Sequence, residues 1–106
     1  MPKPILKLDF KGHRLGPGKI ALLEAIIETG SISAAAKTMD MSYRRAWSLI
    51  DELNKMFAGP CDETAAGGAG GGGAQVTQFG KQVLAAYRKL EAQCAKAAQA
   101  EFKSLS

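Results

Sequence analysis

The sequence has little of what builds a metal site, a disulfide framework or a membrane span. Its 106 residues include 2 cysteines and 1 histidine. Cys61 and Cys94 lie far apart and form no C-x-x-C unit, so we expect neither zinc nor disulfides. No apolar run approaches the ~20 residues of a membrane span, and the N-terminus lacks a signal-peptide pattern. We therefore expect a cytoplasmic protein without a membrane partner.

Catalytic patterns are equally scarce. The sequence contains no evident carboxylate pair, nucleophile with a base, or metal cluster, so we expect no enzyme, no catalytic residue, no cofactor and no small-molecule ligand within this chain. The glycine-rich segment lacks the G-K-[ST] ending of a nucleotide loop, and no apolar strand leads into it. The remaining function classes are binding and interaction.

Length and charge set the outer bounds. A chain of 106 residues suffices for one small domain and not for a DNA-reading domain plus a separate sensor domain. The net charge of +4 and the pI of about 9.2 are mildly basic. Such a balance is compatible with nucleic acid as a partner without requiring it.

Residues 30–57 read as two helices separated by a short turn. Ser31 and Ser42 each precede an apolar-periodic run and can accept from the free N–H groups that open a helix. Asp40 falls in the turn, where a residue that tolerates the left-handed conformation is needed. The core-facing positions of this unit are expected to be Ile32, Met39, Met41, Ala46, Ile50 and Leu53. The pattern predicts a helix-turn-helix with a recognition helix over about 42–57.

The first turns of that recognition helix carry polar and basic side chains, namely Ser42, Tyr43, Arg44, Arg45 and Ser48. Arginine presents a fork of donors that matches guanine O6 and N7 or a phosphate, and a helix N-terminus adds N–H groups for phosphate oxygens. We expect these five residues to enter the major groove of duplex DNA. The alternative is a solvated basic helix end with Tyr43 lying flat on the surface.

Three further side chains in this region have two possible roles. Trp47 could place its indole N–H near a phosphate, but the pattern favours a core residue that packs against the strand or the first helix. Lys37 and Lys55 suit phosphate contacts and a solvated face equally well.

The N-terminal third is expected to support this unit. Alternation over residues 5–11 predicts a short half-buried strand followed by a turn at residues 12–13. A helix should begin at residues 16–18 and end at Gly30. Its apolar face would comprise Ile20, Leu22, Leu23, Ile26 and Ile27.

After residue 57 the chain changes character. Residues 59–60 break the helix, and residues 61–64 can form a short strand. Residues 65–74 contain only alanine and glycine, and residues 75–77 resume a strand or form the approach to a helix. Two strands around a glycine-rich tip predict a wing over about 61–76, which would close a DNA-binding domain spanning residues 1–76.

A long helix should follow from Thr77, making residues 77–106 a linker and dimerisation helix. Part of its apolar face lacks a partner in so small a domain, which predicts a homodimer. The dimer contacts would be Val83, Tyr87, Leu90 and Cys94. The alternative is that the helix folds back onto the strand at residues 6–10 and the chain is a monomer. The fold class is thus mainly α with a small β wing, a winged helix-turn-helix with a long C-terminal dimerisation helix.

Two segments together resemble a known family. The stretch GSISAAAKTMDMSYRRAW, followed by GGAGGGGAQVTQFG, resembles the N-terminal DNA-binding domain of ModE, the molybdate-responsive transcriptional regulator, and more distantly LysR-type winged helices. The resemblance covers about residues 14–90. It implies that Ser31 and Ser33 hold phosphate and that the wing around Gly70, Gly71, Gly72 and Gly73 approaches the flanking groove. It also implies that the C-terminal helix dimerises.

The molybdate-binding domains that follow in ModE proteins are not expected here, since residue 106 is still in the last helix. We therefore expect a DNA-binding transcriptional regulator without a built-in molybdate sensor, with double-stranded DNA and a second copy of the chain as partners. The alternative is a protein-interaction module of ModE-like fold that pairs through its C-terminal helix with another regulator, its uncharged wing having lost DNA affinity.

Overall fold

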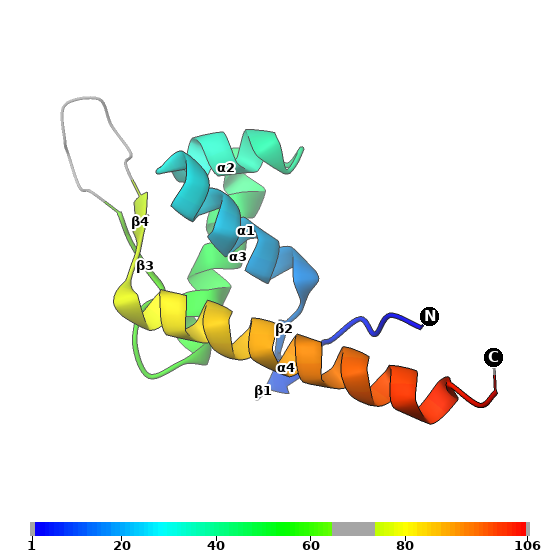
Figure 1. The fold of residues 1–106 in the computed structure, drawn as a ribbon. Coiled ribbons are helices and arrows are strands. Elements are labelled where there is room, and N and C mark those ends of the chain that lie inside the picture. The colour runs from blue at the N-terminus through cyan, green and yellow to red at the C-terminus, as the bar shows by residue number, and fades with distance from the viewer. Residues whose placement is uncertain (1, 65–73, 106) are drawn as a thin grey trace.

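Helices dominate the computed structural model, which describes residues 2–64 and 74–105. In chain order, this part of the protein contains β1 (Leu8–Phe10), β2 (His13–Leu15), α1 (Pro17–Thr29), α2 (Ile32–Thr38), α3 (Tyr43–Met56), β3 (Asp62–Thr64), β4 (Ala74–Val76) and α4 (Gln78–Phe102). The strands form two separate antiparallel pairs, β1 with β2 and β3 with β4. Figure 1 shows α1, α2 and α3 grouped together, with α4 crossing below them.

The N-terminal strand is shorter than expected and has a partner that the sequence did not reveal. Leu8 pairs with Leu15 and Phe10 pairs with His13 across a tight turn. Lys11 and Gly12 form this turn with φ values of 52° and 91°. Two consecutive positive φ values are what a two-residue hairpin needs. The predicted turn at residues 12–13 was therefore wrong by one residue, because His13 already belongs to β2.

The ends of α1, α2 and α3 follow the predicted signals. Gly30 ends α1 with a φ of 78°. The Ser31 hydroxyl oxygen accepts from the Ala34 N–H at 2.9 Å, and the Ser42 hydroxyl oxygen accepts from the Arg45 N–H at 3.0 Å. Asp40 takes the left-handed conformation in the turn, with a φ of 53°. The predicted capping residues are thereby confirmed.

The core lies between these three helices. Small side chains allow α2 to approach its neighbours closely, since Ala35 and Ala36 have almost no exposed surface. Most predicted core positions are buried, namely Ile20, Leu22, Leu23, Ile26, Ile32, Ala46, Ile50 and Leu53. The predicted Met39 and Met41 are half-buried and pack against this core. Ile27 is 44% exposed, because it lies beyond the stripe of α1 that faces α2 and α3. Its assignment to the apolar face was wrong.

The second hairpin is joined to the start of α4 by backbone contacts. The Thr77 N–H donates to the Cys61 carbonyl at 2.9 Å, and the Thr77 hydroxyl donates to the Pro60 carbonyl at 2.7 Å. Thr77 also caps α4 by accepting from the Gly80 N–H. A Cβ on Gly80 would lie 2.2 Å from the Cys61 carbonyl oxygen, so only glycine permits this approach. The predicted pair of strands and the predicted cap are both confirmed.

The first half of α4 packs on the body, whereas its C-terminal half extends beyond it (Figure 1). The Tyr87 side chain is 2% exposed, and its hydroxyl donates to the Leu6 carbonyl at 2.7 Å. Val83 is also buried. The expectation that Tyr87 lacks cover within one chain was wrong, because α4 does fold onto the N-terminal segment.

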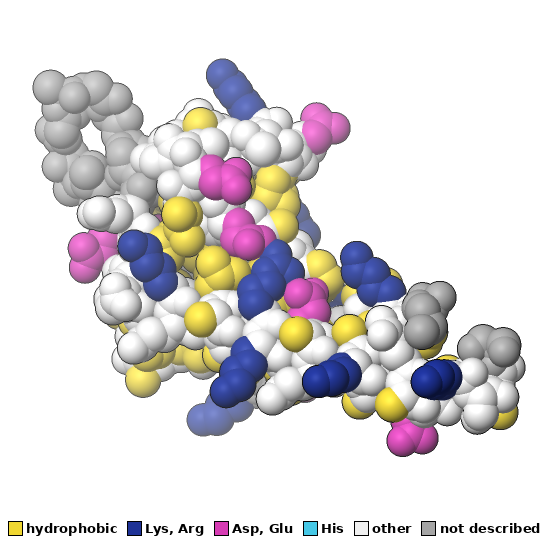
Figure 2. All heavy atoms as spheres, in the orientation of Figure 1, with side chains coloured by type: hydrophobic (Ala, Val, Ile, Leu, Met, Phe, Trp, Pro, Cys, Tyr) yellow, Lys and Arg dark blue, Asp and Glu magenta, His cyan; other side chains and the backbone are white. Residues whose placement is uncertain are grey.

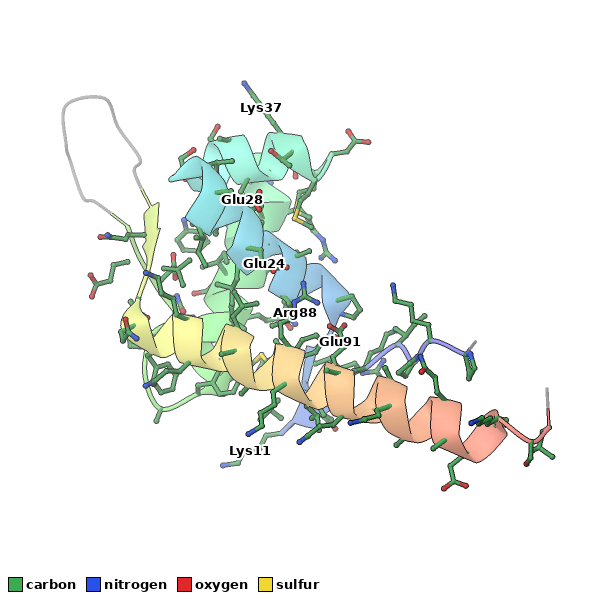
Figure 3. All side chains as sticks on the ribbon, viewed as in Figure 1. Lys11, Glu24, Glu28, Lys37, Arg88 and Glu91 are labelled. Carbon is green, nitrogen blue, oxygen red and sulfur yellow. The ribbon has the colours of Figure 1, made fainter. Side chains whose placement is uncertain are left out.

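An ion-pair network adds a second connection between α4 and the body. The Arg88 guanidinium bonds to Glu24 of α1 and, at 2.8 Å, to Glu91 of α4. Figure 3 shows Arg88 reaching from α4 toward Glu24. These hydrogen bonds raise the pKa of Arg88 above its usual value. Acidic and basic side chains are interspersed on the face that Figure 2 shows.

Candidate nucleic-acid interface

The outward face of α3 brings together the predicted recognition residues. Ser42, Tyr43, Arg44, Arg45 and Ser48 are all exposed. Positions three and four apart share a helix face, so Arg44 and Ser48 lie on one stripe. A shallow groove runs along this stripe and is lined by Tyr43, Arg44, Trp47, Ser48 and Asp51. The structure therefore gathers the predicted residues on one accessible surface.

Trp47 belongs to this surface and not to the core. Its side chain is 49% exposed, whereas the neighbouring Ala46 is fully buried. The close approach of α2, permitted by its alanines, leaves room for a methyl group at the inward position and not for an indole. The prediction that Trp47 packs in the core was wrong. Trp47 also lines a small pocket, together with Ile32, Ile50, Asp51, Asn54 and Asp62.

The charge on this surface is positive and unpaired at its start. Among residues 2–64 and 74–105, no acidic side chain lies within ion-pair distance of Arg44 or Arg45. Further along the helix, the Lys55 ammonium pairs with Asp51 at 3.0 Å. The basic character of α3 is thus concentrated at its N-terminus, where the helix dipole is also positive.

The predicted phosphate-holding residues lie at the neighbouring helix start. Ser31 is half-buried and its hydroxyl oxygen is engaged in capping α2, while Ser33 is exposed. The Ser31 hydroxyl hydrogen is still able to donate. Lys37 extends away from α2 into solvent (Figure 3).

The base of the second hairpin is attached to α3 through one amide side chain. Asn54 accepts from the Cys61 N–H at 2.7 Å and donates to the Asp62 carboxylate. In this way β3 is held in a fixed position relative to the recognition face. The predicted DNA contacts at Gly70, Gly71 and Gly72 lie outside the described residues.

Burial at this junction shifts two pKa values. Burial, aided by the adjacent Asp62 charge, raises the pKa of Cys61 to about 11. Burial also raises the pKa of Asp62, and the hydrogen bond from Asn54 opposes that shift. Cys61 is a free, buried thiol, so it acts here as a small apolar side chain.

The predicted dimer contacts divide into two groups. Val83 and Tyr87 are buried within the chain, and Leu90 and Cys94 are half-buried on α4. An apolar hollow lies beside them, between the first hairpin and α4, and is lined by Leu8, Phe10, Leu15, Phe57, Gln82, Val83, Ala86, Tyr87 and Leu90. Only Leu90 and Cys94 of the four predicted residues therefore offer substantial surface to a second chain.

Sequence reasoning missed the polar contacts that position α3. Asn54 is one of them. Another is the buried Lys19 of α1, whose ammonium donates to the Arg14 carbonyl at 2.6 Å and lies 3.6 Å from Glu52 of α3. His13 of β2 lies 3.6 Å from the same carboxylate. These residues are distant in sequence, so no local pattern predicts their contacts. The one available signal was Lys19, a lysine at a position where the apolar stripe of α1 continues.

Residues 2–64 and 74–105 contain neither a membrane span nor a metal cluster. No helix there combines the length and apolar character needed to cross a bilayer. In the same residues, no three His, Cys, Asp or Glu side chains come together as a metal site would require.

The fold is similar to that of a solved structure. It superimposes on the crystal structure of a LysR family transcriptional regulator with a TM-score of 0.58 and 20% identity, over 90% of this chain and 28% of that one. No protein-family model matches the sequence.

Several proteins are similar to this chain in sequence. The chain is 43% identical to the molybdenum-pterin-binding protein MopB of Rhodobacter capsulatus over 93% of its own length and 37% of that protein. It is 45% identical to the molybdenum transport protein ModE of Azotobacter vinelandii, over 76% of its length and 30% of the relative. It is 42% identical to the DNA-binding transcriptional dual regulator ModE of Escherichia coli, over 67% of its own length and 27% of that relative. The chain thus spans about a third of the length of the relatives it matches.

Proposed function

We propose that this chain is a winged helix-turn-helix domain that binds duplex DNA as a transcriptional regulator. The observation that carries the proposal is the start of α3, where Arg44 and Arg45 are exposed and have no acidic partner among the described residues. A capped helix N-terminus with two free guanidinium groups is suited to phosphates and guanine edges. The regulator names of the ModE relatives support the same function.

In this proposal α3 enters the major groove. Arg44 and Arg45 contact bases or phosphates, and Ser42, Tyr43 and Ser48 donate to either. Ser31 and Ser33 hold backbone phosphates at the start of α2. The hairpin closed by β3 and β4 reaches the flanking groove, with Gly70, Gly71 and Gly72 nearest the duplex.

The proposal includes a homodimer formed through the C-terminal helix. The C-terminal half of α4 extends away from the body, and Leu90 and Cys94 leave part of its apolar surface uncovered. Two copies paired in this way would present two recognition helices to half-sites about 34 Å apart on one face of DNA. Residues 1–76 then read DNA and residues 77–106 pair the chains.

A fluorescence-anisotropy titration tests the DNA-binding function. The protein is titrated against a pool of randomised duplexes at two salt concentrations, and bound sequences are recovered and read. The Arg44→Ala/Arg45→Ala double variant is compared with Lys89→Ala/Lys96→Ala, which removes the same charge from exposed positions of α4. We expect a log–log salt slope near about −5, recovery of a palindrome, and loss of binding in the α3 variant alone.

The single variants then assign each arginine. If Arg44 or Arg45 is bidentate to guanine, its alanine variant loses on the order of 1–3 kcal/mol and relaxes the preference at one base pair. Uniform weakening across sequences assigns that arginine to a phosphate.

The second candidate is a protein-interaction module that pairs through α4 with another regulator. It is favoured by the apolar hollow beside α4 and by the absence of lysine and arginine from the sequence of the predicted wing, residues 61–76. Absence of duplex binding at low salt, together with a salt-insensitive protein contact, would replace the first proposal with this one.

A further inference from the structure

We propose that Trp47 is a specificity-determining residue whose indole ring packs against the C5-methyl group of a thymine in the major groove. This inference rests on the DNA-binding function proposed above and adds a base type that the arginines do not read. It concerns a side chain that the sequence pattern assigned to the core and that the structure exposes.

Trp47 lies beside the residues that are proposed to meet the duplex. Trp47 follows Arg44 by one helical turn and lines the same groove as Tyr43, Arg44 and Ser48. Any duplex that approaches Arg44 from the outward side of α3 therefore also meets the indole. The rise of an α-helix places the two Cα atoms about 4.5 Å apart along the axis, between one and two base-pair steps of 3.4 Å.

The ring of Trp47 is about half covered by the protein. Trp47 lines a small pocket together with Ile32, Ile50, Asp51, Asn54 and Asp62, and 49% of its surface is exposed. A side chain that is already half covered loses less freedom on binding than a fully solvated one does. The exposed part is thus a preformed apolar surface on an otherwise polar face.

The thymine methyl and the indole ring are chemically complementary. This methyl is the most prominent apolar group on the base edges of the major groove, where the N and O atoms are hydrogen-bond donors or acceptors. Arg44 and Ser48 suit the polar groups, whereas the face of an indole ring suits the methyl. The indole N–H can donate to a phosphate, but a phosphate contact would leave the exposed ring face in water.

Replacement of thymine by deoxyuridine tests this inference, because it removes the methyl and keeps the base pair. Each thymine of the selected duplex is replaced in turn, and binding is measured for the unmodified protein and for the variants Trp47→Ala and Trp47→Phe. We expect one position per half-site where the replacement weakens binding of the unmodified protein roughly fourfold. This is the change in affinity expected when the burial of one carbon is lost. The same replacement should change Trp47→Ala binding less than twofold, with Trp47→Phe in between.

The control variant is Tyr43→Ala, which removes the other exposed aromatic of α3 and should retain the methyl sensitivity. Thermal unfolding of each variant establishes that it folds. Tryptophan fluorescence of the unmodified protein gives a second readout, because the sequence has a single tryptophan, Trp47. Its emission should change on binding, and that change should be smaller with the deoxyuridine duplex.

The possible outcomes separate the two proposals. Binding that is insensitive to deoxyuridine at every thymine, or a methyl sensitivity that persists in Trp47→Ala, overturns the thymine contact and leaves the DNA-binding function standing. Equal weakening of Trp47→Ala on all duplexes assigns the indole to the backbone and also overturns it. Absence of any duplex binding overturns both proposals.

Discussion

The two faces of α3 differ in what their side chains contact. The inward face is apolar and nearly without exposed surface, as Leu53 and Ala46 at 0% exposure illustrate. The outward face carries Arg44 and Trp47, which extend into solvent. One helix thus combines a surface that stabilises the domain with a surface that is free to bind. Substitutions on the inward face should therefore change the stability of the domain, whereas those on the outward face should change its binding.

The largest effect is expected from the inward face. Leu53→Ala should lower the free energy of unfolding by about 3 kcal/mol, because it removes a fully buried side chain and leaves a cavity. Urea unfolding followed by circular dichroism measures the change. Ser48→Ala on the outward face is the matched control and should change stability by less than about 0.5 kcal/mol. Similar losses for both variants would contradict the separation of the faces.

A somewhat smaller loss of stability is expected from a substitution of Asn54, at the boundary between the two faces of α3. Asn54→Ala should cost about 2 kcal/mol, because it leaves the buried Cys61 N–H unpaired and removes a donor from Asp62. The control is Lys55→Ala, which breaks an exposed ion pair with Asp51 and should cost about 0.5 kcal/mol at most. Chemical denaturation of the two variants, run side by side, measures the difference. Equal stability of the two would show that the amide does not hold the hairpin.

Ser42 caps α3 and is exposed at its start, so substitutions there can separate capping from binding. Ser42→Ala should lower stability by about 1 kcal/mol through loss of the cap on the Arg45 N–H. Ser42→Asp should keep the cap, because aspartate is an equally good N-cap residue, yet its negative charge should weaken binding to phosphate. Thermal unfolding and DNA titration of the two variants test this. Unchanged DNA affinity in Ser42→Asp would place phosphates away from the start of α3.

The smallest effect is the dependence of stability on pH at Asp62. Burial raises the folded-state pKa of this carboxyl above its ordinary 3.8, so the folded chain holds the proton more tightly than the unfolded chain does. The resulting stabilisation is complete below the unfolded pKa and is lost as the pH rises through the folded pKa. Asp62→Asn should flatten that loss in unfolding curves taken from acidic to neutral pH. Glu101→Gln, which removes an exposed carboxylate from the C-terminal end of α4, is the control and should not flatten it.

Local signals in the sequence were sufficient for the helices of the body and for the start of α4. Ser31, Ser42 and Thr77 cap helices as predicted, and Gly30 ends α1. Each of these depends on hydrogen bonds within a few residues, which a sequence pattern can express. The left-handed Asp40 was predictable for the same reason.

Contacts between distant residues were not predictable in this way. Trp47 and Ile27 have apolar side chains at positions that periodicity cannot distinguish from core, and only the packing of α2 decides their exposure. Tyr87 is covered by the segment around Leu6, a contact between the two ends of the chain. The roles of the predicted DNA and dimer residues stay predictions, because they depend on partners outside this chain.

The base of the second hairpin is held by contacts with α3 and with the start of α4. Both of its strands end in fixed positions, β3 through Asn54 and β4 through the hydrogen bonds of Thr77 and the close approach of Gly80 to Cys61. A segment whose two ends are fixed can change in length at little entropic cost to the rest of the fold. We therefore expect changes in the length or charge of residues 65–73 to alter binding while the three-helix body stays the same.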